Sequence, residues 1–458
     1  MTRPEETRNP LENLLGLFTE VKAGEGGTLL LLAVNVFLLL TAYYLIKPVR
    51  ESLILTGGGA EVKSYASAGQ VLLLAIAVPL YARLAGRFER RKLISIVTLF
   101  FMACLVAFYF LVLAGAPVGV VFYLWVGIFN LMVVAQFWSF ANDVYTTEEG
   151  KRLFVIVAFG ASLGAVVGSK MAGLLLGLVG MAQLLLLACA LLGLSIVLTN
   201  IVDTRERRRG RAPDKDSKQP VDENIGPETG AETDGEGMGK TNGFKLVMRS
   251  RYLTMIAFLM LLANWVNTTG EYILGKLVSN AAAEAVASGM AGGLDAGAWI
   301  GQFYSDFFFY VNVLGVILQL FAVSRILKYM GVRVALLILP LTALVGNLLV
   351  IALPVLAYLR WTKTFENATD YSLQNTVRNV LFLPCTREEK YNAKQAVDTF
   401  FVRAGDVFSA GLVFAGTTYL SFNIRSFAAF NAGLVVIWVI LAVLIGREYR
   451  IKTASGES

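Results

Sequence analysis

The chain contains no histidine and few charged residues. Only 16% of its 458 residues are charged, whereas soluble domains carry about 25%. The absence of histidine excludes histidine-based catalysis, metal sites and proton relays, so proton coupling would need Asp or Glu. The three cysteines, Cys104, Cys189 and Cys385, lie far apart in a pattern that matches neither a metal motif nor a disulfide framework. We interpret them as small buried residues.

The first 27 residues lack the pattern of a secretory signal peptide. They are polar and mixed in charge, with Pro4, Glu5 and Glu6 among them. A secretory signal places basic residues directly before a short apolar run. We therefore expect the first apolar segment to remain in the membrane.

Long apolar runs are the dominant feature of the chain. Hydrophobic residues make up 56% of it, and an apolar run of about 18 residues or more predicts a transmembrane helix. We predict twelve such spans, numbered in chain order, and hence an all-α polytopic membrane protein. The spans cover residues 28–50, 64–86, 92–114, 117–142, 152–179, 181–202, 252–275, 302–326, 331–353, 355–381, 396–421 and 427–446.

Basic residues gather in every second loop. The clusters lie at 83–92, 151–152, 205–211, 325–333, 387–394 and 447–452. Loop 280–300, on the other side of a twelve-span protein, has no Lys or Arg. Because Lys and Arg are enriched in cytoplasmic loops, both termini are expected in the cytoplasm. This bias explains the net charge of +7 without a nucleic-acid partner.

Residues 203–250 form the only long hydrophilic segment. It is rich in charge, Gly and Pro and poor in aromatic residues, which predicts a flexible cytoplasmic linker. It divides the chain into an N-terminal six-helix bundle, 1–202, and a C-terminal six-helix bundle, 251–458. Basic turns after spans 2 and 8, and Glu-Glu pairs before spans 5 and 11, support two similar halves. Parallel repeats of this kind are typical of major-facilitator-type transporters.

Polar residues within the spans concentrate on the first and fourth helices of each half. The strongest sets are Tyr43, Lys47, Arg50 and Glu51; Gln136, Ser139 and Asp143; Asn264, Asn267, Thr268, Glu271 and Lys276; and Lys363, Glu366, Asp370, Gln374 and Arg378. The spacing of the first two sets places each on one helix face, and Lys276 lies beyond the rest of its set. Buried membrane charges normally face the bundle interior or an aqueous cavity. The resemblance to the major-facilitator fold implies that these four helices line a central cavity.

We select eleven residues as candidates for substrate binding or gating. They are Lys47, Arg50, Glu51, Asn267, Glu271, Lys276, Glu366, Asp370, Arg378, Asp398 and Arg403. Cations among carboxylates suit a charged solute, because Lys and Arg bind phosphate or carboxylate groups through charge-assisted hydrogen bonds. Two alternatives stay open: the charges form gate or interdomain salt bridges, or, near the end of span 1, they snorkel to the interface. We also expect Arg403 and Asp406, three residues apart, to pair.

Nothing in the sequence favours an enzyme. Without histidine or a metal motif there is no compact catalytic set, and we expect no cofactor. The glycine run 57–59 lacks the Gly-Lys-Ser/Thr continuation of a phosphate-binding loop, and we expect it in a loop outside the membrane. A nucleotide would therefore be the transported solute and would not be hydrolysed to drive transport.

Four segments carry a family resemblance. They are residues 44–51 (YLIKPVRE); 137–142 (FWSFAN), followed by Glu149, Lys151, Arg152 and Gly160-Ala161; 267–272 (NTTGEY), followed by Lys276; and 390–403, with Lys390, Lys394, Asp398 and Arg403. In this order they resemble the nucleotide transporter family, the plastid and obligate-intracellular-bacterial ATP/ADP translocases. The resemblance covers nearly the whole chain. The order of Lys47 and Arg50, the intervening Pro48, and Asp143 in place of a neutral polar residue favour a divergent bacterial branch.

The resemblance implies exchange of ATP for ADP, or import of nucleotides, by alternating access. It places Lys47, Arg50, Glu51, Glu271, Lys276 and Arg403 near the phosphates or the gates. We expect a monomer in the bacterial cytoplasmic membrane, with a nucleotide or other anionic solute and the lipid bilayer as partners. Two other hypotheses stay open: a major-facilitator carrier for another charged solute, with or without proton coupling, and a non-transporting membrane scaffold or sensor.

Overall fold

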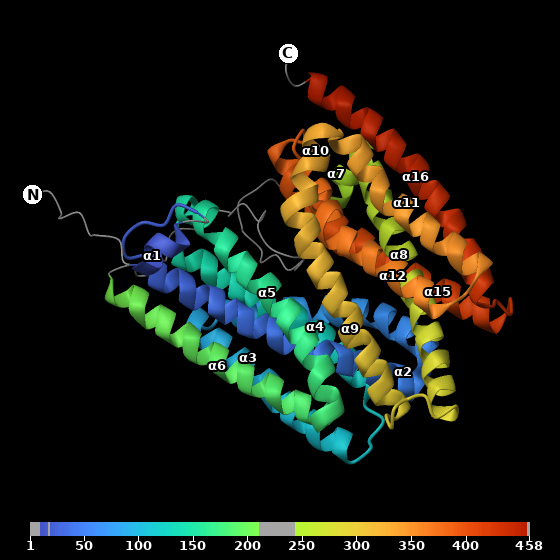
Figure 1. Ribbon diagram of the computed structural model, residues 1–458. Coiled ribbons are helices and arrows are strands. Elements are labelled where there is room, and N and C mark those ends of the chain that lie inside the picture. The colour runs from blue at the N-terminus through green and yellow to red at the C-terminus, as the bar shows by residue number, and fades with distance from the viewer. Residues whose placement is uncertain (1–9, 17–18, 210–242, 456–458) are drawn as a thin grey trace, which may run out of the picture. The chain divides into compact units, whose positions relative to one another are not determined.

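The structure is a computed structural model that describes residues 10–16, 19–209 and 243–455. All regular elements in these ranges are helical (Figure 1). Ten of the described helices are long and apolar enough to cross a membrane. The prediction of an all-α polytopic membrane protein is confirmed.

The first long helix, α2 (Gly26–Ala85), contains spans 1 and 2. The two spans meet at Gly59, whose φ is +76° and ψ −177°. Glycine adopts positive φ without the steric cost that a Cβ imposes. The two spans are therefore joined by the single residue Gly59, without a loop. The prediction that span 1 ends at residue 50 before a loop is wrong.

The remaining helices of the first half follow the predicted spans closely. They are α3 (Arg90–Leu113), α4 (Gly119–Val144), α5 (Thr147–Val179) and α6 (Met181–Arg208), with the short α1 (Pro10–Leu15) before α2. A capping box starts α5: the Glu149 amide donates to the Thr146 hydroxyl at 3.4 Å, and the Thr146 amide donates to the Glu149 carboxylate at 3.0 Å. This cap satisfies amides that have no partner inside the helix.

Three spans of the second half are interrupted by π-helical turns. The elements are α7 (Gly243–Arg249), α8 (Arg251–Ala287), α9 (Ala296–Ile317), η1 (Leu318–Ala322), α10 (Val323–Tyr329), α11 (Gly331–Ala352), α12 (Leu356–Thr369), η2 (Asp370–Gln374), α13 (Asn375–Leu381), η3 (Glu389–Ala393), α14 (Lys394–Ala396), η4 (Val397–Phe401), α15 (Val402–Thr418) and α16 (Ile424–Ser455). The π turns, η1 to η4, lie in or beside spans 8, 10 and 11. Span 10 is built from α12, η2 and α13. With α2 counted as two spans, the described chain contains twelve long helical segments.

The contacts divide the chain into two compact units. Unit 1 comprises Met1–Val49, Val78–Ala116 and Val126–Gly235, and unit 2 comprises Arg50–Ala77, Pro117–Trp125 and Glu236–Ser458. Unit 2 thus joins the second half of the chain to the end of span 1 and the starts of spans 2 and 4. In a twelve-span chain these three segments lie on the side opposite the termini, which we call the distal side. The division into bundles 1–202 and 251–458 stays a prediction, and most of its linker, residues 210–242, lies outside the described residues.

A seam of small residues holds helices together in unit 1. Gly160, Gly164 and Gly168 of α5 pack on the backbone of α2 at Ala33, Phe37 and Thr41. A Cβ at Gly164 would lie 2.4 Å from the carbonyl oxygen of Phe37. Small residues at four-residue spacing allow this close approach in membrane helices.

The second half repeats the pairing. Gly405 of α15 packs on α8, where a Cβ would lie 2.8 Å from the carbonyl oxygen of Leu261 and 2.7 Å from the amide nitrogen of Trp265. Span 11 therefore packs on span 7 as span 5 packs on span 1. Likewise α11 packs on α16 as α3 packs on α6. Corresponding pairs in each half agree with the repeats predicted from the basic turns.

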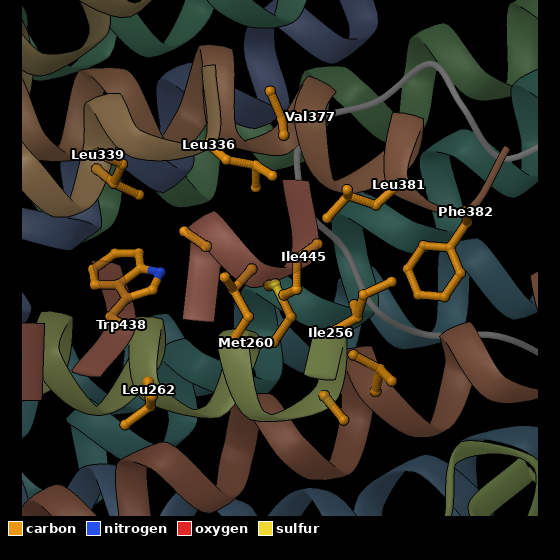
Figure 2. Packing of buried hydrophobic residues seen from close by; sticks show 14 of the residues in the cluster. Ile256, Met260, Leu262, Leu336, Leu339, Val377, Leu381, Phe382, Trp438 and Ile445 are labelled. Atoms are coloured by element: carbon orange, nitrogen blue, oxygen red, sulfur yellow. The ribbon is translucent and has the colours of Figure 1, made fainter. Parts of the chain in front are cut away.

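An apolar core packs the helices of the second half together at the end opposite the distal side. We call this end, on the side of the termini, the proximal side. Ile256 and Met260 of α8 meet Leu336 of α11, Leu381 of α13 and Ile445 of α16 (Figure 2). This packing fixes α8 along its proximal length. The polar residues of the same helix follow in the distal part, where they form the site described below.

Candidate functional site

The candidate site is a row of six alternating charges in unit 2, which we call the charge ladder. In order it consists of Arg50, Glu51, Lys63, Glu271, Lys363 and Glu366. Arg50, Glu51 and Lys63 come from α2, Glu271 from α8, and the last two from α12. The ladder therefore connects helices from both halves of the sequence on the distal side.

The contacts of the ladder differ in length. Lys63 Nζ lies 2.7 Å from Glu51 Oε2, and Lys363 Nζ lies 2.9 Å from Glu366 Oε1. Arg50 Nε donates to Glu51 Oε1 at 2.9 Å. Glu271 bridges the two lysines more loosely, with each Nζ 3.7 Å from one of its carboxylate oxygens. The central carboxylate is thus the weakest junction of the ladder.

The ladder is formally neutral and largely buried, although the side chains of Arg50 and Glu271 are 15% and 23% exposed. Glu51 and Lys363 are each 1% exposed. Removing charges from water is costly, and their mutual attraction offsets that cost only when each has close partners. Three cations and three carboxylates meet this condition, so an unbalanced change at any position exposes the remaining charges to a low-dielectric surrounding.

Neutral side chains contact four members of the ladder. The Arg50 guanidinium lies 4.9 Å from the ring centroid of Tyr123, and Lys63 Nζ lies 5.3 Å from that of Tyr304. Lys363 Nζ donates to Asn267 Oδ1 at 2.9 Å. Asn367 Nδ2 donates to Glu271 Oε1 at 3.2 Å. These contacts hold the cations toward aromatic faces and the central carboxylate in place.

A second ion pair joins the two halves beside the ladder. Lys276 Nζ of α8 lies 2.7 Å from Glu61 Oε1 of α2, and the Tyr272 hydroxyl donates to the same oxygen at 3.1 Å. Glu61 and Lys63 on α2 therefore face Lys276 and Glu271 on α8 with opposite signs. Ser52 adds a bond, donating from Oγ to the carbonyl oxygen of Gly297 at 2.7 Å.

Six of the eleven selected residues lie in this network. They are Arg50, Glu51, Asn267, Glu271, Lys276 and Glu366. The burial and pairing of Arg50 and Glu51 favour a structural network over snorkelling. Lys47 lies elsewhere: it belongs to unit 1, where Nζ is 5.8 Å and 5.1 Å from the ring centroids of Tyr43 and Tyr44.

The remaining selected residues lie further along the membrane. Arg378 Nε is 3.9 Å from Asp398 Oδ1, a pair that joins spans 10 and 11 toward the proximal side. Arg403 pairs with Asp406 at 3.4 Å, as the spacing predicted. Asp370 lies in η2 between Glu366 and Arg378 on span 10. The selected residues thus form separate groups along the spans.

The sequence prediction missed Lys63 and Glu61 and did not select Lys363. Glu61 and Lys63 lie in the segment 51–63 that the prediction leaves between spans 1 and 2. A signal was present: Gly57-Gly58-Gly59 is followed by charges two and four residues after Gly59, which fits a kinked helix as well as a loop. Lys363 was on the polar stripe of span 10, and only its position opposite Glu271 distinguishes it. The described residues contain no cluster of His, Cys, Asp and Glu that could hold a metal ion.

Twelve helical segments in repeated pairs, with a charged network between halves, define a membrane transporter. The chain belongs to the major facilitator superfamily, which it matches over residues 30–365. This family is typically non-enzymatic, and its members are multi-pass integral membrane proteins.

Two curated relatives are distant in sequence. The chain is 21% identical over 488 aligned positions to ADP,ATP carrier protein 2 of Chlamydia pneumoniae, which covers 90% of this chain and 87% of that protein. It is 20% identical over 374 positions to ADP,ATP carrier protein 1 of Chlamydia trachomatis serovar D, which covers 72% of this chain and 64% of the relative. The resemblance to the nucleotide transporter family is therefore supported as distant homology.

Solved transporters share the fold. A D-xylose–proton symporter aligns with a TM-score of 0.58 at 12% identity, covering 91% of this chain and 96% of that one. The nucleoside transporter NupG gives 0.58 at 14% identity, covering 91% and 99%. A bacterial homolog of the human lysosomal transporter Spinster, in an inward-facing conformation, gives 0.54 at 14%, covering 98% of both chains. Identities this low establish the architecture alone.

Proposed function

We propose that this protein is a nucleotide antiporter of the ATP/ADP type that works by alternating access. The observation that carries the proposal is the charge ladder, in which three cations meet three carboxylates where the two sequence halves join. The distant similarity to two chlamydial ADP,ATP carriers supports a nucleotide as the solute. The solute is transported and serves neither as cofactor nor as fuel.

A phosphate chain competes with carboxylates for the same cations. Its oxygens accept charge-assisted hydrogen bonds from Lys and Arg as carboxylate oxygens do. Lys63 and Lys363 reach Glu271 only at 3.7 Å, beyond ordinary hydrogen-bond length. These two contacts are the ones that an anionic solute replaces at the smallest cost.

The distribution of charge explains exchange. Arg50, Glu51 and Lys63 carry a net charge of +1, and Glu271, Lys363 and Glu366 carry −1. The two sets attract each other and close the distal side, which we assign to the exterior with both termini in the cytoplasm. A bound polyanion substitutes for Glu271 and releases the closure. An empty carrier stays closed, so each outward solute must be replaced by an inward one.

Counterflow in liposomes tests the proposal. Purified protein is reconstituted, the liposomes are loaded with ADP, and uptake of labelled ATP is measured with and without the internal load. We expect uptake that depends on internal ADP and is unaffected by a pH gradient. Uptake driven by a pH gradient without internal nucleotide would instead indicate a proton-coupled carrier. Absence of uptake by folded protein under any load would refute nucleotide transport.

A matched pair of substitutions on α8 connects the activity to the ladder. Glu271→Gln keeps the shape of the side chain but removes the charge that both lysines share. Glu284→Gln makes the same change on an exposed residue of the same helix. We expect Glu271→Gln to abolish exchange and Glu284→Gln to leave it unchanged. Equal exchange by both variants would contradict the role of the ladder.

A further inference from the structure

Span 10 contains a buried amide that the protein leaves unsatisfied. Gln374 is 3% exposed. Neither its Oε1 nor its Nε2 has a hydrogen-bond partner among the described residues. Nearly all buried side-chain polar atoms in proteins find a partner, so an exception calls for an explanation. Its neighbours on η2 contrast with it, because Ser372 Oγ donates to the carbonyl oxygen of Ala368 at 2.6 Å.

The position of Gln374 on the helix relates it to the charges. It follows Glu366 by eight residues and precedes Arg378 by four, which corresponds to about 12 Å and 6 Å along the axis at about 1.5 Å per residue. It therefore lies between the charge ladder and the Arg378–Asp398 pair. Of the polar residues on this stripe, Gln374 is the neutral one with both a donor and an acceptor to offer.

The local backbone is also irregular at this point. Gln374 is the last residue of the π turn η2 (Asp370–Gln374). Single π turns inside α-helices widen the helix by one residue and occur frequently at functional sites. The unsatisfied amide and the π turn are independent observations that coincide in the part of span 10 between two groups of charges.

We infer that Gln374 contacts the base of the transported nucleotide and selects adenine. This rests on the proposed function and adds a specificity-determining residue to it. A glutamine amide presents a donor beside an acceptor, which matches the amino group and ring nitrogen on an adenine edge. A guanine edge with two acceptors pairs better with Arg or Lys. Lys63 and Lys363 hold the phosphates, while Gln374 distinguishes the base.

Nucleotide preference measured on a matched pair of variants tests this assignment. Gln374→Leu removes the amide, and Gln319→Leu makes the same change in the π turn η1, on an exposed helix face. Initial uptake of labelled ATP, GTP and UTP into ADP-loaded liposomes is compared with wild type. We expect wild type and Gln319→Leu to prefer ATP. The preference of Gln374→Leu for ATP over GTP should fall by about 5- to 150-fold, the range that one bidentate amide–base pair supplies.

Thermal melting without nucleotide provides a readout that a structural glutamine would not give. Replacing a buried unsatisfied amide by a hydrocarbon removes a desolvation cost. We therefore expect Gln374→Leu to melt at a higher temperature than wild type. A variant that melts lower, or fails to fold, overturns the assignment, because the amide then has a partner in the free protein.

The remaining outcomes separate this inference from the proposed function. An unchanged ATP-to-GTP ratio in Gln374→Leu overturns the role of Gln374 alone. A wild type that exchanges ATP, GTP and UTP equally also overturns it, while nucleotide antiport stands. A wild type that exchanges no nucleotide overturns both, and that result is visible before any variant is made.

Discussion

Two polar networks, one in each unit, are built from different groups. In unit 1, Asn35 of α2 donates to the Thr199 hydroxyl at 2.8 Å and accepts from Ser195 at 2.5 Å. These groups are neutral, and each is satisfied by a fixed neighbour. In unit 2, the charge ladder consists of charges that share partners, with Glu271 between Lys63 and Lys363.

We propose that this difference separates fixed contacts from contacts that change during transport. Neutral hydrogen bonds and the glycine seam of α5 fit only one arrangement of helices, because close backbone contacts do not deform gradually. A charge ladder tolerates exchange of partners, because any anion of suitable shape can replace a carboxylate. Under the proposed function, the Asn35 network and the glycine seam provide fixed packing, and the charge ladder provides the contacts that respond to solute. Four sets of substitutions test this comparison.

The largest effect is expected from unbalancing the ladder. Lys363→Met leaves Glu271 and Glu366 short of a cation and should destabilise the protein by about 3–5 kcal/mol, with loss of exchange. Lys363→Met combined with Glu366→Leu removes one charge of each sign. We expect the double variant to recover most of its melting temperature in detergent but none of its exchange. A double variant as unstable as the single one would show that charge balance does not stabilise this region.

A smaller loss of stability is expected in the seam of unit 1. Gly164→Ala places a methyl group against the Phe37 carbonyl oxygen, and overpacking of this kind costs about 1–3 kcal/mol. Gly177→Ala, on the same helix, meets no atom within 4 Å and serves as the control. Thermal melting should therefore separate the two alanines. Equal melting temperatures would mean that the seam deforms easily and that the comparison between units fails.

The Glu61–Lys276 pair should affect transport more than stability. Both side chains are partly exposed, and such pairs contribute at most about 1 kcal/mol. Glu61→Lys and Lys276→Glu each place like charges together and should slow exchange several-fold. The double variant restores an attractive pair in the opposite sense, so exchange should recover. If the double variant is as slow as the single ones, the pair does not act as a closure.

The smallest effect concerns a residue in the apolar end of unit 2. Burial raises the pKa of the Cys385 thiol from 9.0 to about 11, and the residue is 6% exposed. Because only the thiolate is nucleophilic, alkylation at neutral pH should be slow. In a Cys104→Ala/Cys189→Ala background, the rate should rise toward a pH of about 11.

The same shift predicts a weak dependence of stability on pH. An unfolded cysteine releases its proton at lower pH than the folded one does. Stability from this group is therefore fully present below pH 9 and declines as the pH rises toward about 11. Cys385→Ala should lack this component of the decline. Rapid alkylation of Cys385 at pH 7 would indicate that the apolar end opens and is not the closed region that the contacts describe.

Most of the fold followed from hydrophobic length. Apolar runs predicted every span, and the basic loops predicted which ends share a side. The error at the end of span 1 arose from Gly57-Gly58-Gly59, because glycine serves both loops and kinked helices and its φ is not encoded locally. Because of that one boundary, the predicted site omitted Glu61 and Lys63, although it included their neighbours Arg50 and Glu51.

By itself, the sequence determined the helices, their number and the faces on which charges lie, because these depend on periodicities of three to four residues and on the thickness of the membrane. Only the tertiary structure decided which charges pair. Lys63 and Lys363 meet at Glu271 across 300 residues of sequence, and such a pairing depends on how helices from both halves pack. It also left the amide of Gln374 without a partner, which no local pattern predicts, because satisfaction of a buried group depends on every helix around it.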